Sequence, residues 1–415
     1  MSERAGRRHR VVMVATSYPR FPGDTVGTFM EPIAHEVARR GHDVHLVAPW
    51  HPAITRPARE GGVAFHFFRY APHPALNVFG YAAGLREDVR LRGSTWLAAP
   101  LALTAGAWAA RRVAREVDAT IVHGHWVIPG GAMAAAAAAS RPLVVSLHGS
   151  DVFVAERHAL VRVVARRVFA RAAWVTACSA DLRDRALDLG ARASRSEVVP
   201  YGVDPARFGP NPEARARLRA ALGLDTGQVL VFAVGRLVRK KGFEYLVDAT
   251  AHLARSCPGA VVAIAGSGDL AGELRERAGR VGAGDRLRWL GLVAQDAVAD
   301  WLAAADVAVV PSIRDDAGNV DGLPNVVMEA LASATPLVTT LAGGIGAVVR
   351  PGITAEVVPE RDAEALAAAI TRLAVDPARR RGLGDAAREE VVARFSWAHV
   401  AERLEAVYDR VAPAP

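Results

Sequence analysis

The sequence predicts an α/β protein built from two consecutive domains, and three observations support that prediction. The chain has 415 residues, which is too long for a single hydrophobic core of ordinary size. Short aliphatic runs alternate with helical patterns, which is typical of parallel sheets covered by helices. The alternation is interrupted once, by Pro200-Tyr201-Gly202-Val203-Asp204-Pro205 and then Gly209-Pro210-Asn211-Pro212, before it restarts. We therefore place the link between the two domains there.

Composition indicates a soluble globular protein, because 51% of the residues are hydrophobic and 23% are charged. The net charge of +8 favours nucleic acid, acidic lipid surfaces or phosphorylated ligands as partners. Arginine outnumbers lysine, and a high-GC coding bias also produces an arginine excess. The positive charge is therefore weak evidence about partners, and we expect no nucleic-acid partner. The two cysteines, Cys178 and Cys257, are far apart and have no metal-ligand spacing. A reducing cytosol is the simplest setting for them.

No segment resembles a signal peptide or a membrane-spanning helix. Residues 1–10 are basic but lack an apolar region and a cleavage site. The stretch that comes nearest to a membrane span, 94–110, is uncharged, contains Pro100 and is followed by Arg111 and Arg112. It fits a buried helix of the first domain, with a helix on a membrane surface as the alternative. We expect a cytoplasmic protein, with a peripheral position at the inner face of the membrane left open.

The first half begins with a strand, a loop rich in proline and glycine, a helix ended by Gly41, and a second strand, which together form a βαβ unit. Apolar runs predict strands at 11–15, 44–48, 63–68, 119–122, 143–147 and 174–177. Helices are expected at 29–40, at 131–139 and from Ser179 or Asp181 onwards.

The second half repeats the pattern. Strands are expected at 229–234, 260–265, 287–290, 307–311 and 336–340, and helices at 243–254, 298–304, 324–332, 363–375, 377–394 and 397–411. The sequence leaves open whether the last helix packs back onto the first half. No repeat of 20–50 residues is present.

Polar and glycine-containing loops follow many of these strands. In open α/β sheets, ligands bind at the carboxyl ends of the strands. These loops contain Gly27, His148, Gly235-Arg236, Gly266, the Asp321 loop and Gly343-Gly344. Two facing domains would form one cleft lined by these loops.

The stretch 320–330 is the most informative. It joins an Asp321-Gly322 turn to a helix start at Pro324, and Glu329 lies eight residues after Asp321. A helix N-terminus collects N–H groups and partial positive charge, so it suits an anion. Two carboxylates beside an anion site fit a sugar nucleotide, because phosphate binds the N–H groups and hydroxyls bind the acids. The alternative is a capped helix with one structural acid.

Arg236 and Lys241 are candidates for holding a diphosphate. Fixed cations would stabilise the negative charge that grows on a phosphate as a sugar leaves, without a metal. The alternative is a solvated basic loop, which Arg239 and Lys240 fit better.

His148 follows a predicted strand and precedes Gly149, so it can approach a substrate closely. Its alternative is a structural histidine. His123 and His125 have the same position after an earlier strand and remain open, and the histidine spacing does not fit zinc. Gly27 is a weaker candidate, since its loop is no dinucleotide fingerprint, and the chain has no Walker A sequence or G-x-S-x-G elbow.

Taken together, these motifs resemble the retaining glycosyltransferases of the GT-B fold, in the "glycosyl transferases group 1" family (glycosyltransferase family four), over nearly the whole chain. The family's Glu-x7-Glu reads here as Asp321-x7-Glu329, and the strand after it begins Pro336-Leu337-Val338. The other matching motifs are Gly235-Arg236-Leu237…Lys241-Gly242, His148-Gly149-Ser150-Asp151 and Pro200-Tyr201-Gly202-Val203-Asp204.

The resemblance implies two facing Rossmann-like domains with a cleft between them. Residues 1–203 would bind the acceptor and 204–394 would bind the nucleotide sugar. Residues 395–415 would form a C-terminal helix, and whether it packs back on the first domain stays open. It also implies transfer of a hexosyl group from a UDP- or GDP-sugar to an acceptor hydroxyl, with retained configuration and no obligatory metal or cofactor. The acceptor would be a glycan, a lipid-linked sugar or a small metabolite, as in cell-envelope or polysaccharide biosynthesis.

Roles carry over residue by residue. Catalysis would depend on His148, Arg236, Lys241 and Asp321. Arg236 and Lys241 would hold the donor diphosphate, Glu329 the ribose, Asp321 the sugar hydroxyls, and the first-turn N–H groups near Asn325 and Val326 the β-phosphate. Donor contacts would also come from Gly27, Gly235, Gly266, Gly322 and Leu323.

The chain also departs from the family pattern. Position 321 is Asp where Glu is usual, so its side chain is one methylene shorter. Gly343-Gly344-Ile345-Gly346-Ala347 stands where Gly-Gly-Ile-Pro-Glu is usual, and Ala355 replaces a common glycine. These departures keep two alternatives open, a sugar-nucleotide epimerase on the same fold and a non-catalytic protein that binds a nucleotide sugar or a membrane surface.

Overall fold

The computed structural model describes residues 8–24, 26–71, 80–81, 85–86, 90–91 and 93–412. The basic tail before Arg8 and Thr25 of the first loop lie outside these residues, as do the side chains of 94–97 in the uncharged stretch. The chain divides into two compact units, one of Met1–Pro200 with Trp397–Pro415 and the other of Tyr201–Ser396. The predicted class, α/β with two parallel sheets, is confirmed.

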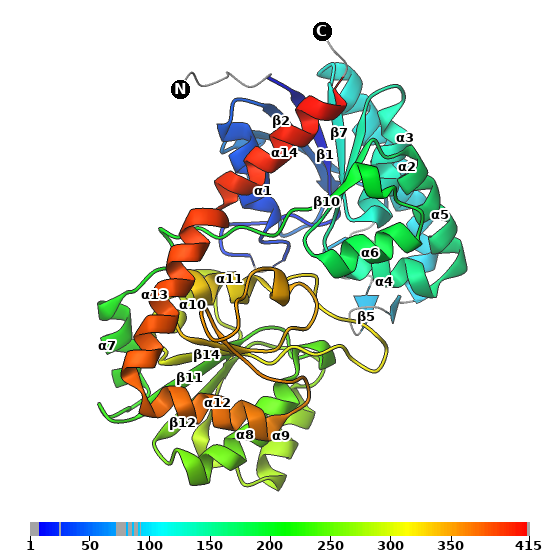
Figure 1. Ribbon diagram of the computed structural model, residues 1–415. Coiled ribbons are helices and arrows are strands. Elements are labelled where there is room, and N and C mark those ends of the chain that lie inside the picture. The colour runs from blue at the N-terminus through cyan, green and yellow to red at the C-terminus, as the bar shows by residue number, and fades with distance from the viewer. Residues whose placement is uncertain are drawn as a thin grey trace. The chain divides into compact units, whose positions relative to one another are not determined.

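Unit 1 contains a sheet in which every pairing is parallel except that of its edge strand β3 with β4. Strand β1, labelled in Figure 1, shows the sequence pattern: the four residues after its first, Arg10, are apolar and buried. In spatial order the strands are β10 (Ser196–Val198), β9 (Trp174–Ala177), β8 (Leu143–Leu147), β7 (Ile121–His125), β1 (Arg10–Val14), β2 (Asp43–Pro49), β4 (Val63–Phe68) and β3 (Arg59–Glu60). A separate antiparallel pair joins β5 (Leu85–Arg86) to β6 (Arg90–Leu91).

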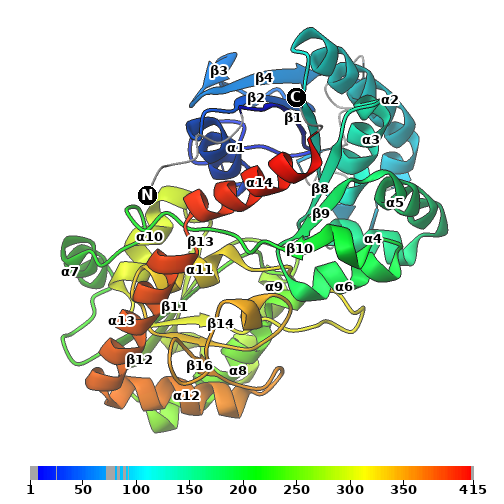
Figure 2. The same ribbon diagram turned by 45° about the horizontal axis from the view of Figure 1, so that its top comes forward.

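Helices cover both faces of this sheet. The last helix of the chain, α14 (Trp397–Val411), lies beside α1 (Met30–Arg39) in both views (Figures 1 and 2) and shares one apolar cluster with it. On the opposite face α2 (Gly93–Glu116) packs on α3 (Ala132–Ala138). The other helices are α4 (Ser150–Arg157), α5 (Ala159–Arg171) and α6 (Ala180–Asp188). Ser179 caps α6 by accepting a hydrogen bond from the Leu182 N–H.

Unit 2 contains a wholly parallel sheet that matches the predicted strands closely. In spatial order the strands are β13 (Leu287–Gly291), β12 (Ala260–Ala265), β11 (Val229–Val234), β14 (Val307–Val310), β15 (Leu337–Thr339) and β16 (Glu356–Val357). Its helices are α7 (Pro212–Ala221), α8 (Phe243–Ser256), α9 (Ala271–Arg280), α10 (Gln295–Ala304), α11 (Asn325–Ala332), α12 (Ala363–Val375) and α13 (Pro377–Arg394).

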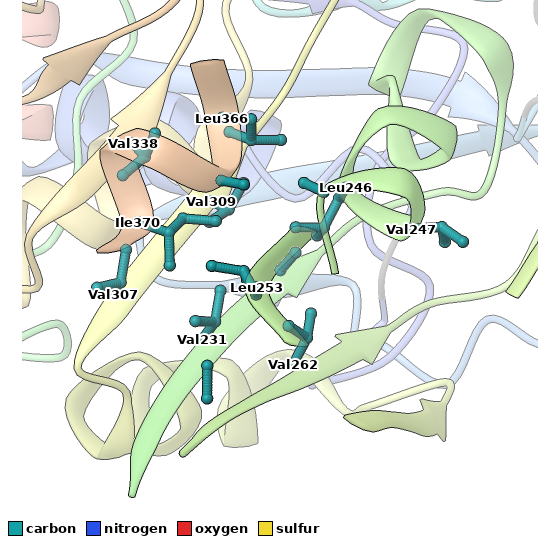
Figure 3. Packing of buried hydrophobic residues seen from close by; sticks show 14 of the residues in the cluster. Val231, Leu246, Val247, Leu253, Val262, Val307, Val309, Val338, Leu366 and Ile370 are labelled. Carbon is teal, nitrogen blue, oxygen red and sulfur yellow. The ribbon is translucent and has the colours of Figure 1, made fainter. Parts of the chain in front are cut away.

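The core of unit 2 shows why the strands and helices form where they do. Alternate residues of β11 point to one face, so Val231 meets Leu246 and Leu253 of α8 and Ile370 of α12 in one buried cluster (Figure 3). Burying side chains of this size stabilises the fold by about 1.5–3 kcal/mol each. The sheet is thereby fixed, and its carboxyl-end loops have a rigid base.

Two local predictions were wrong. The strand expected at 119–122 is β7, which runs from Ile121 to His125, because His123 and His125 have hydroxyl and imidazole partners inside the core. Helix α11 begins at Asn325 rather than Pro324, since Pro324 has an extended backbone and stands as the N-cap residue. Both changes concern residues at the candidate site.

Candidate active site

The centre of the candidate site in unit 2 is the carboxylate of Asp321, which lies between two lysines. Nζ of Lys240 is 2.9 Å from Oδ1 and Nζ of Lys241 is 2.6 Å from Oδ2. The lysines come from a single helical turn after β11, whereas Asp321 precedes α11. The structure therefore brings together two residues predicted to act on the donor.

Burial makes this ion-paired group stiff. The side chains of Lys240, Asp321 and Lys241 are 6%, 12% and 15% exposed. Burial alone would raise the pKa of Asp321, but the two ammonium groups outweigh it and hold that pKa well below its usual value. Asp321 is consequently ionised at every pH at which the protein would be used.

The interpretation of Lys240 as a solvated side chain was wrong. Its backbone carbonyl accepts a hydrogen bond of 2.9 Å from the Ile313 N–H, which ties the turn to the loop after β14. Gly242 ends the turn with φ +66°, and a Cβ there would lie 1.9 Å from the Pro311 carbonyl oxygen. Because that loop approaches so closely, the Lys240 side chain is directed inward.

Glu329 lies on α11 and is 8% exposed. Its Oε1 accepts a hydrogen bond of 3.2 Å from Nε2 of Gln295, the first residue of α10. Burial raises the pKa of Glu329 to about 7, opposed by the charge of Arg207, the Gln295 hydrogen bond and the charge of Lys241. The carboxyl group therefore changes its charge near neutral pH.

The first turn of α11 carries Asn325 and Val326, both partly buried, and within the described residues no side chain caps it. Gly322 and Leu323 just before it are buried. The N-terminal end of a helix attracts anions through its N–H groups and its dipole. This end thus has the character expected of a phosphate site.

Glycines let the neighbouring loops of unit 2 touch. At Gly266, with φ +138°, a Cβ would lie 1.9 Å from the Gly235 carbonyl oxygen. At Gly343, with φ +63°, a Cβ would lie 2.0 Å from the Asp321 carbonyl oxygen. The predicted Gly235, Gly266 and Asp321 positions are consequently parts of one packed set of loops, while Arg236 beside them is exposed.

In unit 1 the structure brings His148 and the Gly27 loop together. The Phe29 ring, two residues after Gly27, has its centroid 4.6 Å from that of His148, and Trp126 meets His148 edge-on at 5.0 Å. Gly27 itself has φ +66°, and a Cβ there would crowd Ser17 at 3.2 Å. Aromatic contacts thus join His148 to the loop that carries Gly27.

Asp151 fixes the backbone around His148. Its Oδ1 accepts from the Gly149 N–H at 3.1 Å, and its Oδ2 accepts from the Val127 N–H at 2.6 Å. Burial raises the pKa of Asp151 to about 7, although the backbone N–H groups oppose that rise. The side chain clamps the turn after β8 to the segment that follows β7.

Burial holds the imidazoles of His123, His125 and His148 neutral. Burial lowers the pKa of His148 to about 3 and that of His123 to about 3 as well. His125 donates to or accepts from His148, with Nδ1 and Nε2 3.0 Å apart. A neutral His148 can make a hydrogen bond to a substrate hydroxyl but cannot serve as a standing cation.

Sequence reasoning missed Lys240 and Gln295. Lys240 had a signal in its position beside Lys241, but its partner Asp321 is remote in sequence. Gln295 had none, because an amide at the start of a surface-type helix is ordinary. Within the described ranges, no group of three or more histidine, cysteine or acidic residues could hold a metal ion.

Two family models match the chain. The model described as "Glycosyl transferases group 1" matches residues 214–390, and the one described as "Glycosyltransferase Family 4" matches residues 26–207. Together the two matched ranges include every candidate residue named above.

Three similar proteins come from different settings. A GDP-mannose-dependent alpha-(1-6)-phosphatidylinositol monomannoside mannosyltransferase of Mycobacterium tuberculosis is 31% identical over 409 residues, covering 95% of this chain and 97% of its own length. A glycogen synthase of the same species is 28% identical over 417 residues, covering 96% and 94%. The crystal structure of Anabaena Alr3699/HepE in complex with UDP superposes with a TM-score of 0.75 at 20% identity, covering 95% and 98%.

Proposed function

The chain belongs to the group 1 glycosyl transferases and is a retaining enzyme of the GT-B fold that uses a nucleotide-sugar donor, and on this premise we propose how its residues divide the work. The observation that carries the proposal is the Lys240–Asp321–Lys241 ion-paired group at the carboxyl ends of the unit 2 strands. This buried group contains both a cation that could bind a phosphate and a carboxylate that could accept hydrogen bonds from sugar hydroxyls.

Lys241 and Arg236 would hold the diphosphate of the donor. Lys241 is the more exposed of the two paired lysines, and Arg236 follows β11 as an exposed side chain. The N–H groups at the start of α11, near Asn325 and Val326, would face the β-phosphate. These donors would stabilise the negative charge that develops as the sugar leaves.

Carboxylates would bind the hydroxyl groups. Glu329 would accept from the ribose, with Gln295 fixing one of its oxygens. Asp321 would accept from the transferred sugar, and Gly266, Gly322 and Leu323 would line the same loops. Because Asp321 shares its charge with two lysines, its reach toward the sugar is limited by those ion pairs.

His148 and Gly27 of unit 1 would meet the reacting sugar and the acceptor. The bond between the sugar's anomeric carbon and the leaving phosphate oxygen breaks, and a bond to the acceptor oxygen forms on the same face. The acceptor proton goes to the leaving phosphate, so no side chain need remove it. His148, being neutral, would orient a hydroxyl of the sugar.

For the substrates, we propose a GDP- or UDP-hexose as donor and a lipid-linked or glycan acceptor. The similarity to a mycobacterial mannosyltransferase named for GDP-mannose and a phosphatidylinositol mannoside supports this choice. GDP-mannose is therefore the first donor to test. A small-metabolite acceptor remains the alternative that an acceptor panel would reveal.

A lipid acceptor would bring the protein to a membrane surface, and α2 offers a suitable face. Among the described residues no helix is long and apolar enough to cross a membrane. Leu101 and Trp108 of α2, which are 56% and 66% exposed, are seven residues apart and so lie on one side of the helix. Exposed Arg111 and Arg112 follow them. Apolar and cationic side chains together favour an anionic lipid surface.

Co-sedimentation with vesicles tests this surface. The protein should sediment with phosphatidylglycerol vesicles, and Trp108→Ser should weaken this. Leu292→Ser is the control, because Leu292 of unit 2 is similarly exposed. Equal sedimentation of the Trp108 variant and the wild type would rule the α2 face out.

The catalytic proposal is tested by nucleoside diphosphate release across a panel of GDP-, UDP- and ADP-sugars. Release that depends on an acceptor supports a transferase, whereas a donor converted without an acceptor would indicate an epimerase. Turnover that disappears in Lys241→Ala while the fold is retained would exclude a binding protein without activity. Failure to bind any of the donors would contradict the proposal.

A further inference from the structure

A buried chain of side chains leads from the last helix of the protein to His148. It begins at Tyr408 of α14, which is fully buried, and passes through His123 and His125 of β7. Residues 123 and 125 of a strand share one face of the sheet. That face is the one that α14 covers, and α14 lies along β1 and α1 in Figure 1.

The first part of the chain is hydrogen-bonded. The Tyr408 hydroxyl is 2.8 Å from Nδ1 of His123, and Nε2 of His123 is 2.7 Å from the Ser146 hydroxyl. Ser146 is in turn 2.6 Å from the Thr176 hydroxyl. Both ring nitrogens of His123 are consequently hydrogen-bonded to hydroxyl groups, which hold the ring in one orientation.

The second part is the pair that touches the candidate site. The ring of His125 lies against that of His123, with centroids 4.2 Å apart, and against that of His148, 5.3 Å apart and nearly parallel. Its Nδ1 bonds to Nε2 of His148. Between these two nitrogens there is room for one proton, so the tautomer of His125 is coupled to that of His148, and the contact depends on how the His125 ring is held.

We propose that Tyr408 is a positioning residue for catalysis, which fixes His123 and through it the His125–His148 pair. This inference rests on the proposed role of His148 at the reacting sugar. It explains a feature that the donor site does not use, namely two buried histidines inside a core strand. It also gives the last helix of the chain a part in the reaction besides covering the sheet.

The test replaces Tyr408 with phenylalanine, which removes the hydroxyl and keeps the ring. We expect kcat to fall roughly ten- to a hundredfold, as small misplacements of catalytic groups do, while KM for the donor stays unchanged. Nitrogen-15 chemical shifts of the His148 ring, assigned with His148→Gln, should report a changed or mixed tautomer. Ser146→Ala removes the other bond to His123 and should lower kcat in the same direction.

Tyr18→Phe is the matched control. Tyr18 is an equally buried tyrosine of unit 1, and its hydroxyl lies 3.3 Å from Nε2 of His35 on α1. This variant should lose a comparable tyrosine–histidine bond and keep wild-type kcat. An equal loss of kcat in Tyr18→Phe would reduce the effect to general destabilisation and overturn the proposal.

Wild-type kcat and unchanged His148 shifts in both Tyr408→Phe and Ser146→Ala would also overturn it. The nitrogen shifts need no turnover, so they are informative even if the proposed function fails. A His148→Ala variant with full activity would refute the role of His148 in the reaction, whereas the shifts would still decide whether Tyr408 positions it.

Discussion

The carboxylate of Asp321 is ion-paired with Lys241, Oδ2 to Nζ at 2.6 Å. The residue proposed to hold the transferred sugar is thus paired with the residue proposed to hold the diphosphate. Lys240 lies 2.9 Å from the other carboxylate oxygen. If Lys241 turned toward a phosphate, Asp321 would therefore still have a counter-charge beside it, which lowers the free-energy cost of the change.

Replacing Lys240 with methionine should remove this second positive charge beside Asp321. Asp321 would then depend on Lys241 alone, so we expect a loss of about 1–3 kcal/mol in the free energy of unfolding, together with weaker donor binding. Urea unfolding and calorimetric titration measure the two effects. The double variant Lys240→Met/Asp321→Asn should recover most of the stability, and a single variant as stable as the wild type would contradict the account.

Gly343→Ala should disturb Asp321 through the backbone. The added Cβ would lie 2.0 Å from the Asp321 carbonyl oxygen, and the backbone there has φ +63°. Donor affinity should fall with little change in the secondary structure seen by circular dichroism. Gly346→Ala in the same loop is the control, since its nearest neighbour would be 3.9 Å away. Equal affinities for the two variants would show that the loop yields without moving Asp321.

Donor binding should depend on pH through Glu329. With its pKa raised to about 7 by burial, the carboxyl group is increasingly protonated below pH 7 and loses its power to accept two hydroxyl donors. Affinity should fall with decreasing pH, approaching tenfold per pH unit. A nucleotide sugar is the proper probe, because its diphosphate does not titrate in this range. Glu329→Gln and Glu329→Ala should bind weakly with a flat profile.

The same shift has the opposite consequence for stability. The folded protein holds the Glu329 proton more tightly than the unfolded chain, whose carboxyl ionises near the ordinary 4.5. Its contribution to stability is therefore fully present below pH 4.5 and is lost as the pH rises to about 7. Glu329→Gln should be more stable than the wild type at pH 8, as measured by urea unfolding. A less stable Glu329→Gln variant at that pH would contradict this, because it would show that the ionised carboxylate is stabilised by more than its hydrogen bond from Gln295.

Asp151→Ala should affect both stability and catalysis. It leaves the N–H groups of Val127 and Gly149 without their acceptor, at a cost of about 1–3 kcal/mol each at most, and frees the turn that carries His148. We expect kcat to fall further than the stability loss explains. As the control, Asp362→Ala removes a carboxylate that accepts from the Ala365 N–H at the start of α12 in unit 2, and it should lower the melting temperature with kcat preserved.

Much of the fold could be predicted because it depends on local patterns. Strands β4, β8, β9, β11 and β12 have the expected bounds, since each is a largely apolar and largely buried run. The helices α12, α13 and α14 were likewise evident from their periodicity and flanking residues.

The site could be predicted only in part, because its contacts join distant segments. Asp321 and Lys241 were each identified by motif, but their ion pair depends on the packing of two loops. Lys240 differs from a solvated lysine through its ion pair with the remote Asp321 and through the approach of Pro311 and Ile313 to its turn. His123 and His125 looked like loop residues, because their buried partners are remote in sequence: His123 bonds to hydroxyl groups of β8 and α14, and His125 bonds to the ring of His148.

The most direct test of the account is the affinity of Lys241→Ala for the nucleotide sugar that the wild type binds most tightly. Calorimetric titration should show at least a roughly tenfold loss, because a charge-assisted phosphate contact is removed. The variant should remain folded and should lose no more stability than Lys240→Met, since Asp321 keeps one lysine in each of the two variants. A folded Lys241→Ala variant with wild-type donor affinity would contradict the assignment of the Lys240–Asp321–Lys241 group as the donor site.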